Sequence, residues 1–336
     1  MTIGAPTGAL MLDRLKGFPA PRFIKTQGLP ALAVFLIVTA YASVTGSPLT
    51  ELILWGLIGG LVATVALDVV RLIGVRFGAF PADMPRIFGS MALGSAPYLP
   101  KHLMANMVSM LSQLPNGPRK DMMEPRIKAM ARMPAKERLT FLTLIYNGLM
   151  KLGQAERERM LKTQIEIVSS LPPEERMRMM EAMDEVMRGS GPHNPAPNPI
   201  PAFRAGLMPK LPMSMFRVLI AKALPLAAQE KGRTMGQVLS AGYLWHFING
   251  ATYGIAYTLL FGQGSWLLAF GWGTFVWLVM MAGMPKMMPM VQLPYPKFMV
   301  VPLIAHWAMA IPIGYFALAF VTPEAPASSL FGPFLT

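Results

Sequence analysis

Three ionisable residues of this sequence lie inside apolar stretches, namely Asp68, His246 and His306. Each histidine comes about eight residues after its stretch begins, and the aspartate comes about eight residues before its stretch ends, so a rise of 1.5 Å per helical residue gives all three a similar depth. An ionisable side chain at the depth of a membrane core usually marks a functional site or an internal ion pair. We therefore expect the three side chains to form one polar cluster.

Four kinds of chemistry fit two imidazoles and a carboxylate. The side chains would hydrogen-bond helices to one another, or His246 and His306 would ligate a haem or another macrocycle. With Asp68 as a third ligand the same histidines suit a transition metal, and the trio would also serve proton or ion conduction. Asp68 and Arg71 are three residues apart, so they would pair on one helix unless Arg71 extends to the membrane surface.

Small residues follow both histidines at intervals of four. They are Gly250 and Gly254 after the first histidine, and Ala310 and Gly314 after the second. Residues at this spacing share one face of a helix, and small residues let a neighbouring helix approach closely. Each imidazole is therefore expected to face protein and not lipid.

Other reactive groups are scarce. The sequence has no cysteine, no phosphate-binding loop, no G-x-S-x-G turn and no H-E-x-x-H motif, so no catalytic residue is predicted and catalysis by this chain alone is not expected. Thirty methionines include the run MMAGMPKMMPM, whose thioethers would bind copper(I) or, as flexible core residues, simply fill space.

The composition indicates an all-α, polytopic membrane protein. Hydrophobic residues make up 53% of the 336, charged residues make up 14%, and the mean hydropathy is +0.44. Five stretches approach the length of about 20 residues that crosses a bilayer core. They are 29–43, 52–75, 238–261, 266–284 and 298–321. The end of the first, from Ala40 to Ser43, resembles a signal-peptidase site, so a cleaved leader is an alternative there.

Charge orients these five helices. All 30 Lys and Arg residues fall on one side of the arrangement, whereas 42–51, 262–265 and 322–336 contain none. The positive-inside rule then places the N-terminus inside and the C-terminus outside a bacterial inner membrane. A net charge of +13 is explained by an anionic lipid surface, so the bilayer is the expected partner and nucleic acid is not.

A long insertion separates the second and third predicted spans. Its periodicity predicts a cytoplasmic helical subdomain, in which two stripes would pack together: Leu142, Ile145 and Leu149, and Met177, Met180, Met183 and Met187. The following amphipathic segment would lie in the membrane interface or dock on a partner helix. The predicted order is a basic segment (1–28), two membrane helices (29–78), the subdomain (79–188), a Pro/Gly-rich tether (189–212), the amphipathic segment (213–237), three membrane helices (238–321) and an outer tail (322–336).

Two motifs resemble those of a family. The patterns H-xxx-G-xx-YG-xx-Y, from His246 to Tyr257, and H-xxx-A-xxx-GY, from His306 to Tyr315, are similar to helices of small uncharacterised bacterial inner-membrane proteins of the YagU-like kind. The resemblance covers about 110 residues and implies a four-helix membrane core of unknown activity. The insertion and the first apolar stretch depart from that pattern.

These features predict a non-catalytic accessory, assembly or scaffold subunit of a larger membrane complex. Membrane-protein partners would bind through the helical insertion, and the cluster of two histidines and one aspartate would hold the core together. Two alternatives stay open. One is an electron-transfer protein that binds haem or a transition metal, and the other is an ion or solute carrier.

Overall fold

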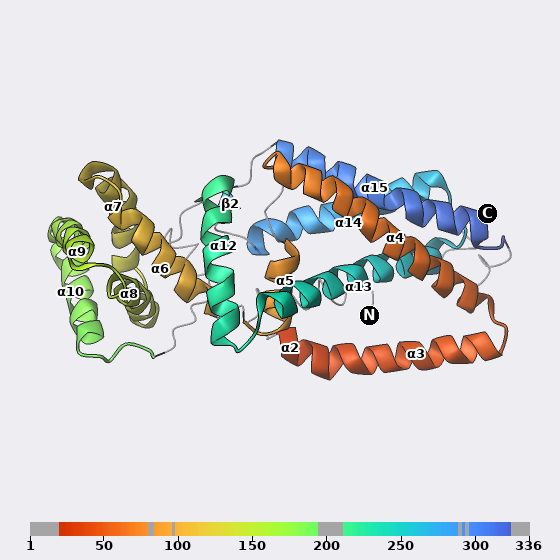
Figure 1. Ribbon diagram of the computed structural model, residues 1–336, viewed down its shortest axis with the longest axis horizontal. Coiled ribbons are helices and arrows are strands. Elements are labelled where there is room, and N and C mark those ends of the chain that lie inside the picture. The colour runs from red at the N-terminus through yellow and green to blue at the C-terminus, as the bar shows by residue number, and fades with distance from the viewer. Residues whose placement is uncertain are drawn as a thin grey trace. The chain divides into compact units, whose positions relative to one another are not determined.

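The computed structural model describes residues 20–79, 84–95, 98–193, 211–287, 291–292 and 296–323. Within these ranges every regular element is a helix, apart from one parallel pairing of the two-residue strands β1 (Leu211–Pro212) and β2 (Val291–Gln292), so the predicted all-α class is confirmed. The chain divides into two compact units (Figure 1). Unit 1 comprises Met1–Gly94, Gly236–Met287 and Leu293–Thr336, and unit 2 comprises Ser95–Met235 and Met288–Gln292.

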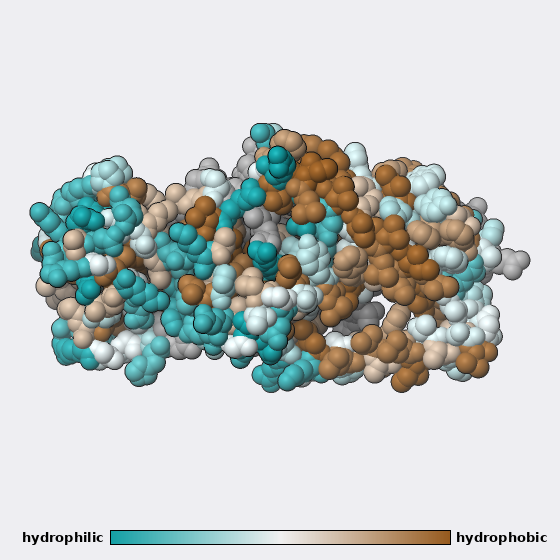
Figure 2. Space-filling view, in the orientation of Figure 1, coloured by the Kyte–Doolittle hydropathy of each residue, from teal (hydrophilic) through white to brown (hydrophobic). Residues whose placement is uncertain are grey.

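Unit 1 contains the apolar helices. They are α2 (Ala20–Phe23), the π-helical η1 (Ile24–Gly28), α3 (Leu29–Val44), α4 (Pro48–Arg76), α5 (Met84–Ala92), α13 (Met235–Phe261), α14 (Trp266–Met287) and α15 (Lys297–Phe320). Figure 2 shows large hydrophobic areas over these helices, whereas hydrophilic residues dominate the visible surface of unit 2.

Four helices in the described part of the chain are long and apolar enough to cross a membrane. They are Ala20–Val44, Pro48–Arg76, Trp266–Gly283 and Lys297–Phe320. The first begins nine residues before the predicted 29–43, because the polar turn before Leu29 continues the helix through η1. The remaining predicted span corresponds to α13, which is not among the four; its Ser, Thr, Asn, His and Gly residues make it less apolar.

Local sequence sets the ends of α4. Gly46 precedes the helix at a φ of 64°, a conformation that glycine adopts without strain. The Ser47 hydroxyl oxygen accepts a hydrogen bond from the backbone N–H of Leu49 at 3.3 Å, and Pro48 occupies the first turn. Gly78 follows the last turn at a φ of 71°. Between these signals α4 runs unbroken for 29 residues.

Glycine contacts join α4 to α13. A Cβ at Gly56 would lie 2.8 Å from the carbonyl oxygen of Gly254, and one at Gly60 would lie 2.2 Å from that of Gly250. Such distances leave no room for a side chain, so the two backbones touch directly. Residue numbers rise along α4 as they fall along α13, so the helices are antiparallel.

α14 and α15 complete a four-helix bundle with α4 and α13. Trp55 of α4 stacks on Phe320 of α15 with ring centroids 4.3 Å apart, and a Cβ at Gly273 of α14 would lie 2.6 Å from the carbonyl oxygen of His306 on α15. All four helices contribute to one buried cluster: Ala63, Ala256, Tyr257, Ala269, Trp272, Val276, Met309, Ile313 and Ala317. This bundle positions the ionisable residues.

The helix formed by α2, η1 and α3 is different. Only 6% of its most apolar window is buried, and large side chains such as Ile37 and Val44 are exposed. An apolar surface of this extent is unfavourable in water and suits contact with lipid.

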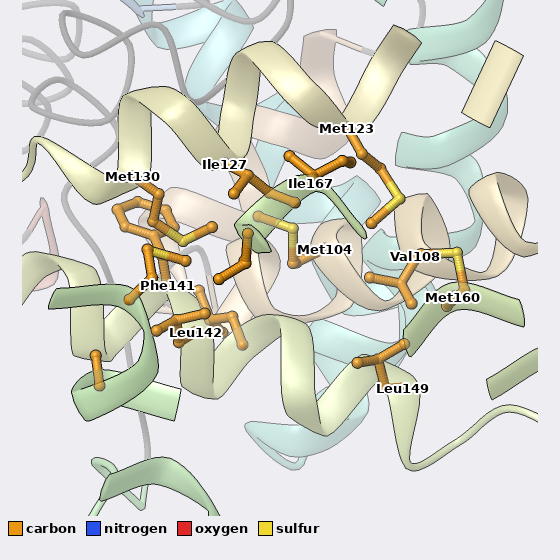
Figure 3. Packing of buried hydrophobic residues seen from close by; sticks show 14 of the residues in the cluster. Met104, Val108, Met123, Ile127, Met130, Phe141, Leu142, Leu149, Met160 and Ile167 are labelled. Carbon is orange, nitrogen blue, oxygen red and sulfur yellow. The ribbon is translucent and has the colours of Figure 1, made fainter. Parts of the chain in front are cut away.

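Unit 2 is a polar helical bundle with its own core. Its helices are α6 (Leu99–Ser112), α7 (Asn116–Ala131), α8 (Ala135–Leu149), α9 (Gln154–Ser169), α10 (Pro173–Met187) and α12 (Met213–Glu230). Figure 3 shows how methionines such as Met104, Met123 and Met130 fill the space around Ile127 and Phe141. Unbranched thioether chains suit such irregular gaps, which supports core filling as the role of these methionines.

One predicted stripe of unit 2 is confirmed and the other is wrong. Leu142 and Leu149 are buried, and Ile145 packs against the same core. On α10, however, Met177, Met180 and Met187 are 58%, 59% and 63% exposed, and only Met183 of the predicted stripe packs against the core. The buried face consists of Met179, Ala182 and Val186. Because α10 carries apolar residues on two faces, periodicity alone does not decide which face packs.

The amphipathic segment forms α12, which packs on α6 within unit 2 (Figure 1). Its apolar side is buried: Phe216, Leu219, Ile220, Ala223, Leu224, Ala227 and Ala228. This arrangement favours helix docking over an apolar face open to the membrane interface. Most of the predicted tether (194–210), the N-terminal 1–19 and most of the outer tail (324–336) lie outside the described residues.

Candidate functional site

Asp68 and His246 meet between α4 and α13. Asp68 Oδ1 lies 3.1 Å from His246 Nε2 and accepts a hydrogen bond from Arg71 Nε at 2.6 Å. All three side chains are largely buried. The structure therefore joins two of the three predicted cluster residues, and it has Arg71 paired with the carboxylate, which is one of the two alternatives predicted from their spacing.

The geometry assigns a role to each group. An ionised carboxylate between a guanidinium and an imidazole N–H has both neighbours as donors, so its charge is offset inside the bundle. In the neutral imidazole, donation from Nε2 leaves Nδ1 as the unprotonated nitrogen. Arg71 is buried and pairs with Asp68 on the same helix. The three groups thus tie α4 to α13 by hydrogen bonds and charge.

Close helix contacts flank His246 on both sides along α13. One turn later, a Cβ at Gly250 would lie 1.7 Å from Thr64 Oγ1. One turn earlier, a Cβ at Gly242 would lie 1.7 Å from the carbonyl oxygen of Pro85 on α5. Gly250 and Gly254 thus lie against α4, and α13 approaches two different helices within three turns.

His306 has a different hydrogen-bond partner. Its ring is buried, and Nδ1 donates a hydrogen bond to the carbonyl oxygen of Pro302 on the same helix at 2.7 Å. The small residues after it pack on α14: a Cβ at Gly314 would lie 2.8 Å from the Ala269 Cβ, and Ala310 lies beside Gly273. The small-residue faces of the two histidine helices therefore contact different neighbours.

The fit of a metal or a macrocycle follows from these contacts. Within the residues that the structure describes, no three His, Cys, Asp or Glu side chains gather closely enough to hold a metal ion. A haem beside His246 would have to separate α13 from α4 or α5, because Gly242 and Gly250 touch those helices directly. The residues around His246 therefore do not fit a macrocycle on that face.

A second titratable cluster joins α6 to α12 in unit 2. Glu230 accepts a hydrogen bond from Lys101 Nζ at 2.7 Å and lies 2.8 Å from His102 Nε2. Burial lowers the pKa of His102, and the hydrogen bond to Glu230 only partly offsets this. Burial also raises the pKa of Glu230, but the hydrogen bonds from Lys101 and His102 outweigh that effect and leave it below its usual value. His102 Nδ1 has no hydrogen-bond partner among the described residues, which suits a neutral ring.

Sequence reasoning missed one part of the site. Gly56, Gly60, Thr64 and Asp68 recur at intervals of four on α4, as do the small residues and the histidine on α13. Reading the two series in opposite directions pairs Gly56 with Gly254 and Gly60 with Gly250, as the bundle does, whereas Asp68 meets His246 one turn out of that register. No comparable spacing of small residues predicted the close approach of α5 to α13.

Searches against protein-family models, curated proteins and solved structures found no match to this chain. Within its described residues, the fold and the site show an all-α protein with four helices long and apolar enough to cross a membrane. The predicted likeness to YagU-like proteins stays a prediction.

Proposed function

We propose that this protein is a non-catalytic accessory or scaffold subunit of a larger complex in a bacterial inner membrane. The observation that carries the proposal is the pairing of Asp68 with Arg71 and His246, which uses these ionisable groups in contacts between helices. Unit 2, with a separate core and a charged surface, is then the part available to partners.

The proposal includes five membrane helices with the N-terminus inside and the C-terminus outside. α13 would be the fifth, because its contacts with α4 extend from Gly56 and Gly254 to Asp68 and His246. A helix that contacts a membrane-spanning helix over three turns lies at the same depth in the bilayer as that helix. Unit 2 would then lie on the cytoplasmic side, as the distribution of Lys and Arg favours.

Purification from native membranes tests the accessory role. The tagged chain would be extracted in mild detergent after chemical crosslinking, and its mass and composition measured. We expect a particle larger than the monomer of 36.8 kDa that contains a second membrane protein in fixed ratio. Recovery of the chain alone, with and without crosslinking, would sink the proposal.

A haem- or metal-binding electron-transfer protein is the second candidate, and His306 provides the observation in its favour. Donation of Nδ1–H to the Pro302 carbonyl leaves Nε2 as the unprotonated nitrogen, and ligating histidines are commonly oriented in this way. The test is a visible spectrum together with metal analysis of the purified protein. A Soret band or a stoichiometric metal that His306→Ala abolishes would favour this candidate.

A further inference from the structure

The exposed face of α10 carries a row of methionines and a row of glutamates, and neither row packs in the core of unit 2. Met177, Met180 and Met187 lie on one side of the helix at intervals of three and seven residues, and each is more than half exposed. The opposite side, with Met179 and Val186, fills the core. A row of large apolar side chains on an otherwise charged helix is typical of an interaction surface.

A row of carboxylates runs beside these methionines. Glu174 precedes Met177 by three residues and Glu181 follows it by four, so both are its neighbours on the helix surface. Glu185 extends the row by one turn. All three glutamates are exposed, and Glu181 and Glu185 make no ion pair within the described part of the chain.

The local charge is opposite to that of the whole protein. Between Pro173 and Met187 there are five acidic and two basic residues, whereas the full chain has a net charge of +13. This acidity disfavours an anionic lipid surface or a nucleic acid as the occupant of the face. It favours a ligand with apolar and cationic groups arranged side by side.

We propose that the α10 face, defined by Met177, Met180, Met187, Glu174, Glu181 and Glu185, binds a basic amphipathic helix of a partner protein. The apolar side of that helix would pack on the methionines, whose flexible side chains adapt to varied surfaces. Its Lys and Arg residues would face the glutamate row. This inference rests on the proposed accessory function and names the surface and the chemistry of the partner.

A synthetic peptide tests the recognition directly. The full chain would be placed in nanodiscs of phosphatidylcholine, and binding of a fluorescent peptide of leucine and lysine at helical spacing, about 18 residues or five turns long, measured by anisotropy. Empty nanodiscs provide the blank. We expect binding above the blank that weakens as salt increases, and little binding of a peptide with glutamate in place of lysine.

Variants locate the binding face. The triple change Met177→Gln, Met180→Gln and Met187→Gln should weaken binding by about tenfold or more, as expected for loss of central apolar anchors. The change of Glu174, Glu181 and Glu185 to Gln should weaken binding and reduce its salt dependence. The matched control is Met150→Gln, because Met150 is an exposed methionine of unit 2 on another helix end. Circular dichroism would check that each variant is folded.

Several results would overturn the inference. These are equal binding to the triple methionine variant, equal binding of the glutamate peptide, or no binding above the empty nanodiscs. The crosslinking experiment separates this outcome from failure of the accessory role. A native partner that is still captured by the triple methionine variant would refute the α10 face while leaving the accessory function standing.

Discussion

Asp68 has two hydrogen-bond neighbours of different kinds, and they act over different ranges of the chain. Arg71 lies three residues away on α4, whereas His246 is 178 residues away on α13. The first contact offsets charge within one helix, and the second joins two helices. Loss of the carboxylate therefore affects both the local charge and the helix packing.

Asp68→Asn should destabilise unit 1. The substitution leaves the Arg71 guanidinium buried without a counter-charge, and breaking a buried pair costs about 3 kcal/mol. Thermal unfolding of the purified protein in detergent would show this as a lower midpoint. Asp121→Asn, at an exposed position of α7, is the control and should leave the midpoint unchanged. A midpoint that is equal for both variants would show that the pair does not stabilise the bundle.

His102 should make unit 2 sensitive to acid. Its pKa is lowered in the folded chain by burial, so the unfolded chain binds a proton more readily and stability is lost as the pH falls below the ordinary value of 6.5. The lowered pKa of Glu230 acts in the same direction at still lower pH, below its ordinary value of 4.5. The unfolding midpoint of unit 2 should therefore decrease between pH 7 and pH 5.

His102→Gln checks the origin of that decrease. Glutamine keeps a side-chain N–H donor for Glu230 but does not titrate, so this variant should show a shallower pH dependence over the same interval. An environment-sensitive fluorophore attached to a cysteine at Met150 would follow unit 2, because the chain has no native cysteine. An unchanged slope in the variant would assign the acid sensitivity to other groups.

At the scale of the helices, the contact between α4 and α13 depends on glycines, which have no side chain to hold the backbones apart. A methyl group at Gly60 would meet the backbone of α13 and not a movable side chain. Gly60→Ala should therefore lower stability by about 1–3 kcal/mol through overpacking. Gly271→Ala is the matched control, because a Cβ there would meet nothing within 4 Å. Comparable unfolding midpoints for the two variants would contradict direct backbone contact between α4 and α13 at Gly60.

The sequence predicted this contact only in part. Intervals of four after His246 correctly placed the ring against protein, because a helix repeats its face at that spacing. The same reasoning did not predict the hydrogen bond from His306 to the carbonyl oxygen of Pro302, because any residue type offers a backbone acceptor. On α10 the spacing of methionines predicted the wrong buried face. Both faces carry apolar residues, and which one is buried depends on contacts with neighbouring helices that spacing along α10 does not show.

At the scale of the whole molecule, the number of membrane crossings is open to direct measurement. The chain has no native cysteine, so single cysteines report accessibility without background. In intact cells, cysteines at Ser47 and Gln263 should react with an impermeant maleimide from outside. Cysteines at Lys120 and Thr234 should react only after the inner membrane is opened.

Cysteines at Thr234 and Gln263 test whether α13 crosses the membrane. Opposite accessibility at these two positions, which flank the helix, requires α13 to cross the membrane. Equal accessibility would mean that α13 does not cross, and five alternating helices would then be wrong. Ser47 and Lys120 serve as reference positions for the two sides in the same cells.

The short separation of Asp68 and Arg71 also has a consequence for biosynthesis. At about 5–20 residues per second, a ribosome would reach His246 roughly 10 to 35 s after it has made Asp68. During that interval α4 has no α13 to hold its carboxylate, yet Arg71 is already present on the same helix. The nascent hairpin of α3 and α4 can therefore enter the lipid with its charge compensated, and the histidine joins an aspartate that is already paired.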